Sequence, residues 1–154
     1  MIVLVTGATS GFGAAIARRF AREGHRIIAA GRRVDRLDAL RASLGDAVFT
    51  MPLDVRNAAA VERAIGALPG DLAAIDLLVN NAGLALGLEP AQRASLDDWE
   101  RMVDTNVKGL MTVTRAVLPG MVTRDRGHIV NLGSTAAHWP YAGANVYEIG
   151  RAHV

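Results

Sequence analysis

Thr6-Gly-Ala-Thr-Ser-Gly-Phe-Gly13 decides the fold of this chain, because it follows a short apolar strand at residues 2–5 and precedes an amphipathic helix. Its three glycines allow a sharp turn and let the backbone come close to a bound anion. The first turn of the helix then offers unpaired N–H groups and the positive end of its dipole. Such a turn is typical of a phosphate site, although a glycine-rich turn can also join a strand to a helix for structural reasons alone.

Apolar strands and amphipathic helices alternate along the rest of the chain. The expected helices cover 14–23, 34–44, 58–68 and 95–123, and the further strands cover 26–30, 47–51, 75–79 and 127–132. The side chains of Asn57 and Ser95 can cap the third and fourth of these helices. This alternation predicts an α/β fold with a doubly wound parallel sheet of the Rossmann type, in which ligands bind at the carboxyl ends of the strands.

The amino-acid composition of the chain argues against several classes of binding partner and of functional site. The 154 residues carry a formal net charge of +2 and no cysteine, and 51% of them are hydrophobic. We therefore expect one packed domain without disulfides, and neither a nucleic-acid nor a membrane partner. The histidines at positions 25, 128, 138 and 153 lack metal-ligand spacing, so no metal is expected. Because the first strand begins at residue 2, we expect no signal peptide and a cytoplasmic protein.

Charged residues follow the second and third strands. Arg32 and Arg33 come where a dinucleotide fold selects its cofactor, and no carboxylate is present there to bind the ribose hydroxyls of NAD. Guanidinium groups pair with a 2′-phosphate through forked hydrogen bonds, so NADP is preferred to NAD. Asp54 and Val55 close the third strand, where a carboxylate can accept from the adenine amino group. The alternatives are a solvated arginine pair that starts the next helix and an aspartate that only turns the chain.

Polar and small residues mark the ends of the fourth and fifth strands. Asn81, Ala82 and Gly83 follow the fourth strand, and the glycine again allows the backbone to approach a ligand. Asn81 could instead brace the neighbouring strand. Asn106 lies in a stretch of the long helix that otherwise faces the core, where an amide competes with helical hydrogen bonds. Taken alone, it is more typical of a structural residue. Ser134 follows the fifth strand.

The motifs together resemble the short-chain dehydrogenase/reductase family. They are the loop 6–13, residues 80–83, Asn106, Ser134 and Tyr147, which comes thirteen residues after Ser134. The resemblance covers residues 1–147 and implies an NADP-dependent oxidoreductase that transfers a hydride between NADP and a small hydroxyl or carbonyl substrate. It is closest to the NADP-dependent 3-hydroxy acid dehydrogenases, also described as L-allo-threonine or serine dehydrogenases. That closer likeness lies in residues 31–33, 84–87 and 134–147.

The resemblance implies a role for each matching residue. Tyr147 is the expected general acid or base, Ser134 holds the substrate oxygen, and Asn106 positions a water in the proton relay. The plainer alternatives are a strand-end turn for Ser134 and a packed helical residue for Tyr147. The expected NADP-binding residues are Gly7, Thr9, Ser10, Gly11, Phe12, Gly13, Arg32, Arg33, Asp54, Val55, Asn81, Ala82, Gly83 and Tyr147.

The chain departs from the family pattern after Tyr147. The family has a lysine four residues beyond its tyrosine, whereas this chain has Arg151, whose larger planar guanidinium is a poor substitute for an ammonium group in proton transfer. The family pattern also continues with two more strands. A common sequencing-library adapter translated in this frame encodes residues 148–154, so we expect a truncated NADP domain at 1–147, incomplete on its C-terminal side. We expect residues 148–154 to be a non-native tail, and a chain ending here to be inactive.

Two other functions remain open for the parent protein. One is a non-catalytic module in which the glycine loop and the arginines hold NADP, with Arg151 as a genuine residue of the chain. The other is a reductase of larger ketones or acyl thioesters, because the segment that would select the substrate is not in this chain. The resemblance also implies a homo-oligomer for the parent protein, through the long helix and the one that follows it.

Overall fold

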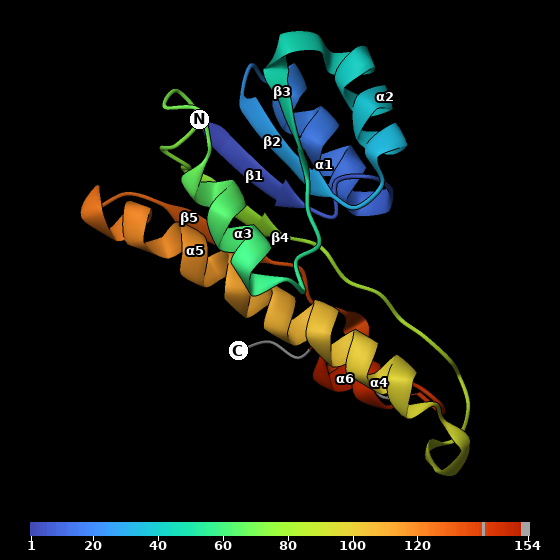
Figure 1. The fold of residues 1–154 in the computed structure, drawn as a ribbon. Helices are drawn as coiled ribbons and strands as arrows, with labels where there is room; N and C mark the ends of the chain where they lie inside the picture. Colours follow the sequence, from blue (N-terminus) through green and yellow to red (C-terminus); the bar gives the residue numbers. More distant parts are fainter. Residues whose placement is uncertain (140, 152–154) are drawn as a thin grey trace.

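The computed structural model describes residues 1–139 and 141–151, and its centre is a parallel sheet. Five strands pair within the described residues in the order β3-β2-β1-β4-β5 (Figure 1). They are β1 (Ile2–Thr6), β2 (Arg26–Gly31), β3 (Val48–Pro52), β4 (Leu77–Asn80) and β5 (His128–Asn131). The sheet grows outward in both directions from β1, which confirms the doubly wound α/β fold and places the carboxyl ends of all strands at one edge.

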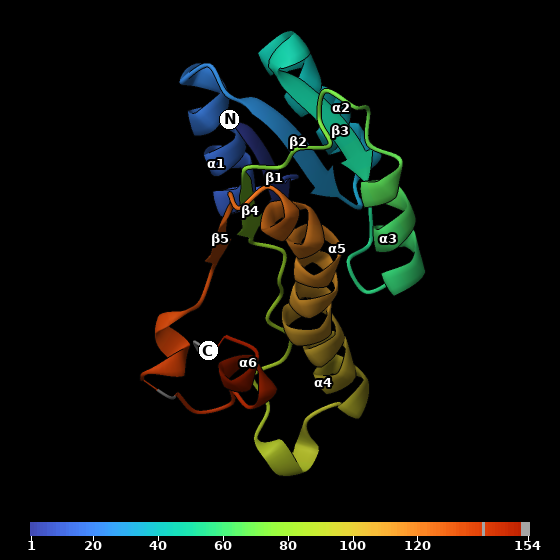
Figure 2. The same cartoon turned by 90° about the vertical axis from the view of Figure 1, so that its left-hand side faces the viewer.

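Helices cover both faces of this sheet (Figure 2). On one face, α1 (Gly11–Arg22) and α2 (Val34–Leu44) pack over Val3 and Val5 of β1. On the other face, α3 (Ala58–Gly66) and α5 (Gly109–Thr123) pack over Leu4. Successive side chains of a strand point to opposite faces, so a continuous apolar strand such as β1 builds both halves of the core.

The start of α1 lies closer to the glycine loop than the sequence suggests. The helix begins at Gly11 rather than at residue 14, because the last glycines of the loop already form its first turn. The expected caps of two other helices are confirmed. Asn57 Oδ1 accepts from the backbone N–H of Ala60 at 3.0 Å, and Ser95 Oγ accepts from that of Asp98 at 3.3 Å.

The long helix expected at 95–123 is interrupted in its middle. It consists of α4 (Leu96–Val103), a wider π-helical turn η3 (Asp104–Lys108) and α5. Asn106 lies within this turn and is 2% exposed. Its amide bonds to a neighbouring loop instead of facing solvent, as expected for a polar residue that competes with helical geometry. The interruption therefore marks the place where the helix meets the edge of the sheet that carries the strand ends.

Shorter elements complete the described chain. They are η1 (Gly45–Ala47), η2 (Ala91–Arg93), η4 (Thr135–Ala137) and α6 (Val146–Ile149). In both views α6 lies beside α4, and it also contacts η4 (Figures 1 and 2). None of the helices in the described ranges is both long and apolar enough to cross a lipid bilayer.

The carboxyl ends of β4 and β5 are tied together by a side chain. Asn80, the last residue of β4, is 2% exposed and pairs in register with Asn131 of β5. Its Nδ2 donates to Asn131 Oδ1 and to Thr114 Oγ1 of α5, both at 2.9 Å. One buried amide thus connects two strands with the helix that covers them.

Candidate functional site

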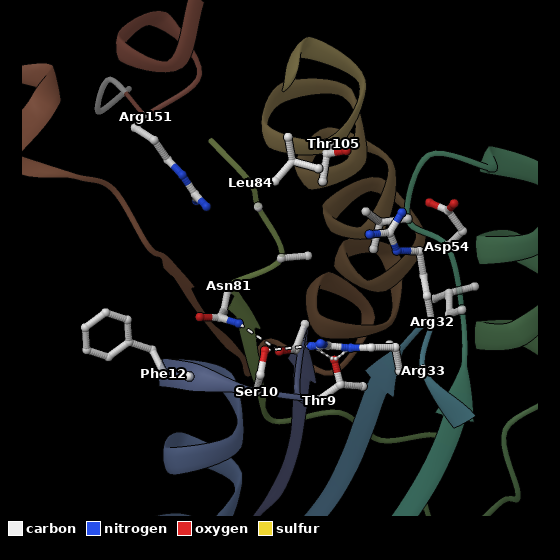
Figure 3. Close-up of a pocket in the computed structure, with 17 residues that line it drawn as sticks. Thr9, Ser10, Phe12, Arg32, Arg33, Asp54, Asn81, Leu84, Thr105 and Arg151 are labelled. Atoms are coloured by element: carbon white, nitrogen blue, oxygen red, sulfur yellow. Dashed lines mark hydrogen bonds between the residues drawn. The ribbon is translucent and has the colours of Figure 1, made fainter. Parts of the chain in front are cut away.

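A cavity of about 460 Å³ opens at the carboxyl ends of the strands (Figure 3). Its volume falls in the range of roughly 300–1,000 Å³ typical of small-molecule sites, and its position is the one where doubly wound sheets bind ligands. Twelve of the residues expected to bind NADP line it: Gly7, Thr9, Ser10, Gly11, Phe12, Arg32, Arg33, Asp54, Val55, Asn81, Ala82 and Gly83. The sequence motifs therefore meet in one cavity, while Gly13 and Tyr147 from the same expected set do not line it.

The glycine loop packs tightly against the end of β4. Gly7 has φ +66°, and a Cβ placed there would lie 2.8 Å from Asn81 Nδ2 and 2.9 Å from Ala82 Cα. A Cβ on Gly13 would overlap the carbonyl oxygen of Gly7 and Asn81 Nδ2. Gly13 thus shapes the cavity without lining it, because the absence of a side chain lets α1 approach the loop that does line it.

Thr6 and Asn81 hold this loop to β4. The Thr6 hydroxyl oxygen accepts from the backbone N–H groups of Asn81 and Ala82, both at 3.0 Å, and Asn81 Nδ2 donates to the Thr6 carbonyl at 2.8 Å. Asn81 therefore braces the neighbouring strand and also lines the cavity. Thr6 was not predicted as a site residue. The sequence feature that could have identified it is a hydroxyl side chain at the end of an otherwise apolar strand.

The N-terminus of α1 is open toward the cavity. Ser10 is the N-cap residue, yet its side chain makes no cap hydrogen bond, and the first turn contains no acidic residue. The Ser10 hydroxyl instead accepts from Arg33 Nη2 at 2.7 Å. The N–H groups of the first turn are left without a capping side chain, which is the arrangement that binds anions at helix ends.

Arg33 is fixed above the glycine loop rather than lying free in solvent. Its Nη2 donates to Thr9 Oγ1 at 2.8 Å, and its Nε approaches the same oxygen at 3.2 Å (Figure 3). Thr9 can sit there because Gly31 has no side chain, since a Cβ on Gly31 would be 2.5 Å from the Thr9 methyl carbon. The residues just before α2 and the loop after β1 thus form one positively charged wall.

Asp54 lies on the same side of the cavity and remains ionised. Its Oδ2 accepts from Arg56 Nη2 at 2.5 Å, and its Oδ1 accepts from the Arg56 backbone N–H at 3.1 Å. The hydrogen bond from the Arg56 side chain is the main reason that the pKa of Asp54 falls below its usual 3.8, and the charge of Arg32 adds to this. Asp54 both turns the chain into the next segment and offers a carboxylate acceptor to the cavity at neutral pH.

The three expected catalytic residues lie outside this cavity lining. Asn106 binds both backbone groups of Leu84, accepting from its N–H and donating to its C=O, each at 2.9 Å. Ser134 Oγ accepts from the backbone N–H of Ala136 at 3.2 Å and so caps η4, as in the turn alternative. Tyr147 is half-buried in α6. The catalytic roles of these residues stay predictions.

Five further residues line the cavity without having been expected there. Gly31, Leu53 and Leu84 flank the expected motifs, and Thr105 has a buried hydroxyl with no partner within the described chain. Arg151 enters from the far side. Apolar neighbours and a residue from a distant helix carry no local sequence signal of a site, which explains why they were missed.

No metal centre accompanies the cavity in the described ranges. Residues 1–139 and 141–151 contain no group of three histidine, aspartate or glutamate side chains placed to hold a metal ion. His153, one of the histidines considered in the sequence, lies outside the described residues.

The whole arrangement matches a known family. Residues 1–152 match the family model described as short chain dehydrogenase. The chain belongs to the short-chain dehydrogenase family. The family match agrees with the strand order and with the glycine loop at the first strand end.

The amino-acid sequence of this short-chain dehydrogenase is similar to those of several bacterial proteins. It is 64% identical over 154 residues to NADP-dependent 3-hydroxy acid dehydrogenase YdfG of Salmonella typhi, in a match that covers all of this chain and 62% of that protein. It is 52% identical over 145 residues to serine 3-dehydrogenase of Agrobacterium fabrum, covering 94% of this chain and 58% of that protein. The chain thus spans about three fifths of the length of these relatives.

Solved structures of short-chain dehydrogenases share the fold closely. Serine dehydrogenase from Escherichia coli has a TM-score of 0.96 and 61% identity, with 98% of this chain and 70% of that chain covered. A closed form of serine dehydrogenase complexed with NADP+ has a TM-score of 0.97 and 61% identity, with 98% and 61% covered.

Proposed function

We propose that the protein containing this chain is an NADP-dependent oxidoreductase that transfers a hydride between NADP and a small hydroxyl or carbonyl substrate. A 3-hydroxy acid such as serine or L-allo-threonine is the favoured substrate. The observation that carries the proposal is the fixed guanidinium of Arg33, which is bonded to Thr9 and Ser10 at the rim of the cavity, next to Arg32. Relatives named for NADP and for 3-hydroxy acids, at 61–64% identity, support it.

The residues between Arg32 and the start of α1 fit the adenosine half of NADP and its pyrophosphate. Arg32 and Arg33 would hold the 2′-phosphate through charge-assisted hydrogen bonds. The open N-terminus of α1 would take the pyrophosphate, and Asp54 would accept from the adenine amino group. When bound, NADP supplies the hydride acceptor or donor of the reaction. Tyr147 would hold or release the proton at the substrate oxygen, and Ser134 would bind the same oxygen.

The proposal is tested by comparing the binding of NADP and NAD to the chain. Each charged hydrogen bond to the 2′-phosphate contributes roughly 1.5–3 kcal/mol, so NADP is expected to bind at least about tenfold more tightly than NAD. Isothermal titration calorimetry at fixed ionic strength measures both dissociation constants. Equal affinity for the two cofactors would remove the proposed role of the arginines.

Thr9 offers a finer test of the same site. Replacing Thr9 with valine keeps the methyl group that lies over Gly31 but removes the hydroxyl that holds Arg33. One lost hydrogen bond of roughly 0.5–1.5 kcal/mol corresponds to about threefold to tenfold weaker NADP binding, with NAD binding unchanged. Thr9→Ser retains the hydroxyl and is the matched control. If Thr9→Ser lost as much NADP affinity as Thr9→Val, the hydroxyl would not be the cause.

A non-catalytic NADP-binding module is the second candidate function. The observation that favours it is the guanidinium of Arg151 inside the cavity lining, where a compact ammonium would suit proton transfer better. Serine oxidation, followed as NADPH absorbance, can be compared in the parent protein with Arg151 and with Arg151→Lys. Turnover that appears with lysine supports the enzyme, whereas equal inactivity of both forms supports the binding module.

We also propose the remaining properties of the parent protein: it is cytoplasmic and homo-oligomeric, with residues 1–147 as native sequence and 148–154 as a foreign tail. The apolar side chains of Met111, Leu118 and Val122 are 61%, 42% and 69% exposed along α5, which supports association with a second copy. Sequencing of clonal genomic DNA through codon 151 tests the proposed boundary, and an uninterrupted frame through Arg151 would contradict it.

A further inference from the structure

Arg151 lies at the end of the cavity opposite the arginine pair. Figure 3 shows Arg32 and Arg33 on one side, beside Asp54 and Thr9, and Arg151 across the cavity beyond Asn81. The N-terminus of α1 lies between these two ends, because Ser10 and Gly11 also line the cavity. A dinucleotide anchored by its 2′-phosphate at one end must therefore extend its second nucleoside toward Arg151.

The guanidinium of Arg151 fills the space over Gly83. A Cβ on Gly83 would overlap Arg151 Nη2 and Cζ and would lie 3.0 Å from Nη1, so the planar group rests on the Gly83 Cα. Arg151 Nη1 donates to the carbonyl of Leu132 at 2.8 Å, just beyond the end of β5. The side chain thus spans from the end of β5 to the segment after β4.

The walls around this guanidinium are fixed on both sides. Leu84, next to Gly83, has its N–H and C=O both bonded to the buried amide of Asn106. On the other side, Gly150 lies so close to Asn106 that a Cβ on Gly150 would be 3.0 Å from the Asn106 Cβ. Backbone movement is therefore a costly way to make room for a second nucleoside beside Gly83.

The second nucleoside of NADP brings no anionic group toward the guanidinium, only ribose hydroxyls and a carboxamide. Arg151 Nε is buried and has no acceptor within the described residues, so an anion would find a donor here. In the proposed site, however, the phosphates would be held by Arg32, Arg33 and the start of α1, and the nicotinamide riboside beyond them is uncharged when reduced and positive when oxidised. A positive ring beside a guanidinium is repelled.

We propose that Arg151 closes the end of the cavity beside Gly83, so that this chain binds the adenosine 2′,5′-bisphosphate half of NADP and excludes the nicotinamide riboside half. The inference rests on the proposed function, because it takes the arginine pair as the 2′-phosphate site. The affinity for NADP then comes from the end of the cavity that carries Arg32 and Arg33, and the nicotinamide riboside half adds little to it.

Calorimetric titration of the 154-residue chain with adenosine 2′,5′-bisphosphate and with NADP+ tests this directly. The two dissociation constants are expected to agree within about threefold, a difference below about 0.7 kcal/mol. In Arg151→Ala, NADP+ is expected to bind about tenfold more tightly, while adenosine 2′,5′-bisphosphate binds as before. Arg19→Ala is the matched control, because Arg19 is 76% exposed on α1 and its loss removes the same charge away from the cavity.

The outcomes separate the two proposals. If the original chain binds NADP+ tenfold or more tightly than adenosine 2′,5′-bisphosphate, the nicotinamide half is accommodated and the closure is refuted, whatever the variants do. If Arg151→Ala weakens NADP+ binding, Arg151 is a cofactor contact and the closure is again refuted. If neither ligand binds, the proposed NADP site itself fails.

Discussion

Replacing Arg32 and Arg33 together with alanine is expected to weaken the binding of adenosine 2′,5′-bisphosphate about a hundredfold. Arg33 is already held over the cavity by Thr9 and Ser10, so its guanidinium needs little reordering to meet a phosphate. Each lost charge-assisted hydrogen bond costs roughly 1.5–3 kcal/mol, and the two arginines together account for the expected loss. Isothermal titration calorimetry with the purified variant measures it.

Adenosine 5′-monophosphate, which lacks the 2′-phosphate, is the control ligand for this variant. Its affinity is expected to stay within about threefold of that of the unaltered chain. Arg36→Ala combined with Arg41→Ala removes the same charge from exposed positions of α2 that do not line the cavity. If this surface variant lost as much affinity as the Arg32 and Arg33 variant, the effect would be long-range electrostatics and not a phosphate site.

Replacing Gly13 with alanine is expected to lower the free energy of unfolding by about 3 kcal/mol. The added methyl group would overlap the Gly7 carbonyl oxygen and the Asn81 amide, both held in place by the bonds between the loop and β4. Urea denaturation followed by circular dichroism measures the change. The cavity is expected to lose ligand affinity as well, since α1 must move away from the loop.

Gly66 supplies the matched control for the glycine variant. It is the last residue of α3, and a methyl group added to it would meet no atom within 4 Å beyond its chain neighbours and its own helix backbone. Gly66→Ala is expected to stabilise the chain by about 0.5–1 kcal/mol, because alanine loses less backbone entropy in a helix. If the Gly13→Ala chain were as stable as the Gly66→Ala chain, the glycine loop would move aside at no cost, and the tight packing described for it would be wrong.

The architecture was predictable because it depends on patterns that repeat along the chain. Apolar strands separated by amphipathic helices specify a parallel sheet, and such a sheet brings every strand end to one edge. Residues as distant as Gly7, Arg33 and Gly83 could therefore be assigned to one cavity from the sequence alone. Caps such as Asn57 were predictable for a related reason, since their partners are three residues away.

Side-chain pairings between distant segments could not be predicted in this way. Nothing local in the sequence shows that the Ser10 hydroxyl bonds to Arg33 instead of capping α1, or that Asn106 binds Leu84 and lies in a π-helical turn. These contacts depend on how closely two elements approach, which is set by packing across the fold. The entry of Arg151 into the cavity belongs to the same class.

The buried amide of Asn80 has a consequence for how the sheet assembles. A parallel strand can slide along its neighbour by two residues and still present the same kind of side chains to the core. Asn80 reaches both Asn131 and Thr114 in the observed pairing, and a slipped β5 would leave a buried amide without its partners, at a cost of roughly 1–3 kcal/mol. Asn80 therefore fixes the register of β5 against β4 during folding. Because it fixes where β5 ends, it also fixes the positions of Leu132 and Ser134, which follow that strand.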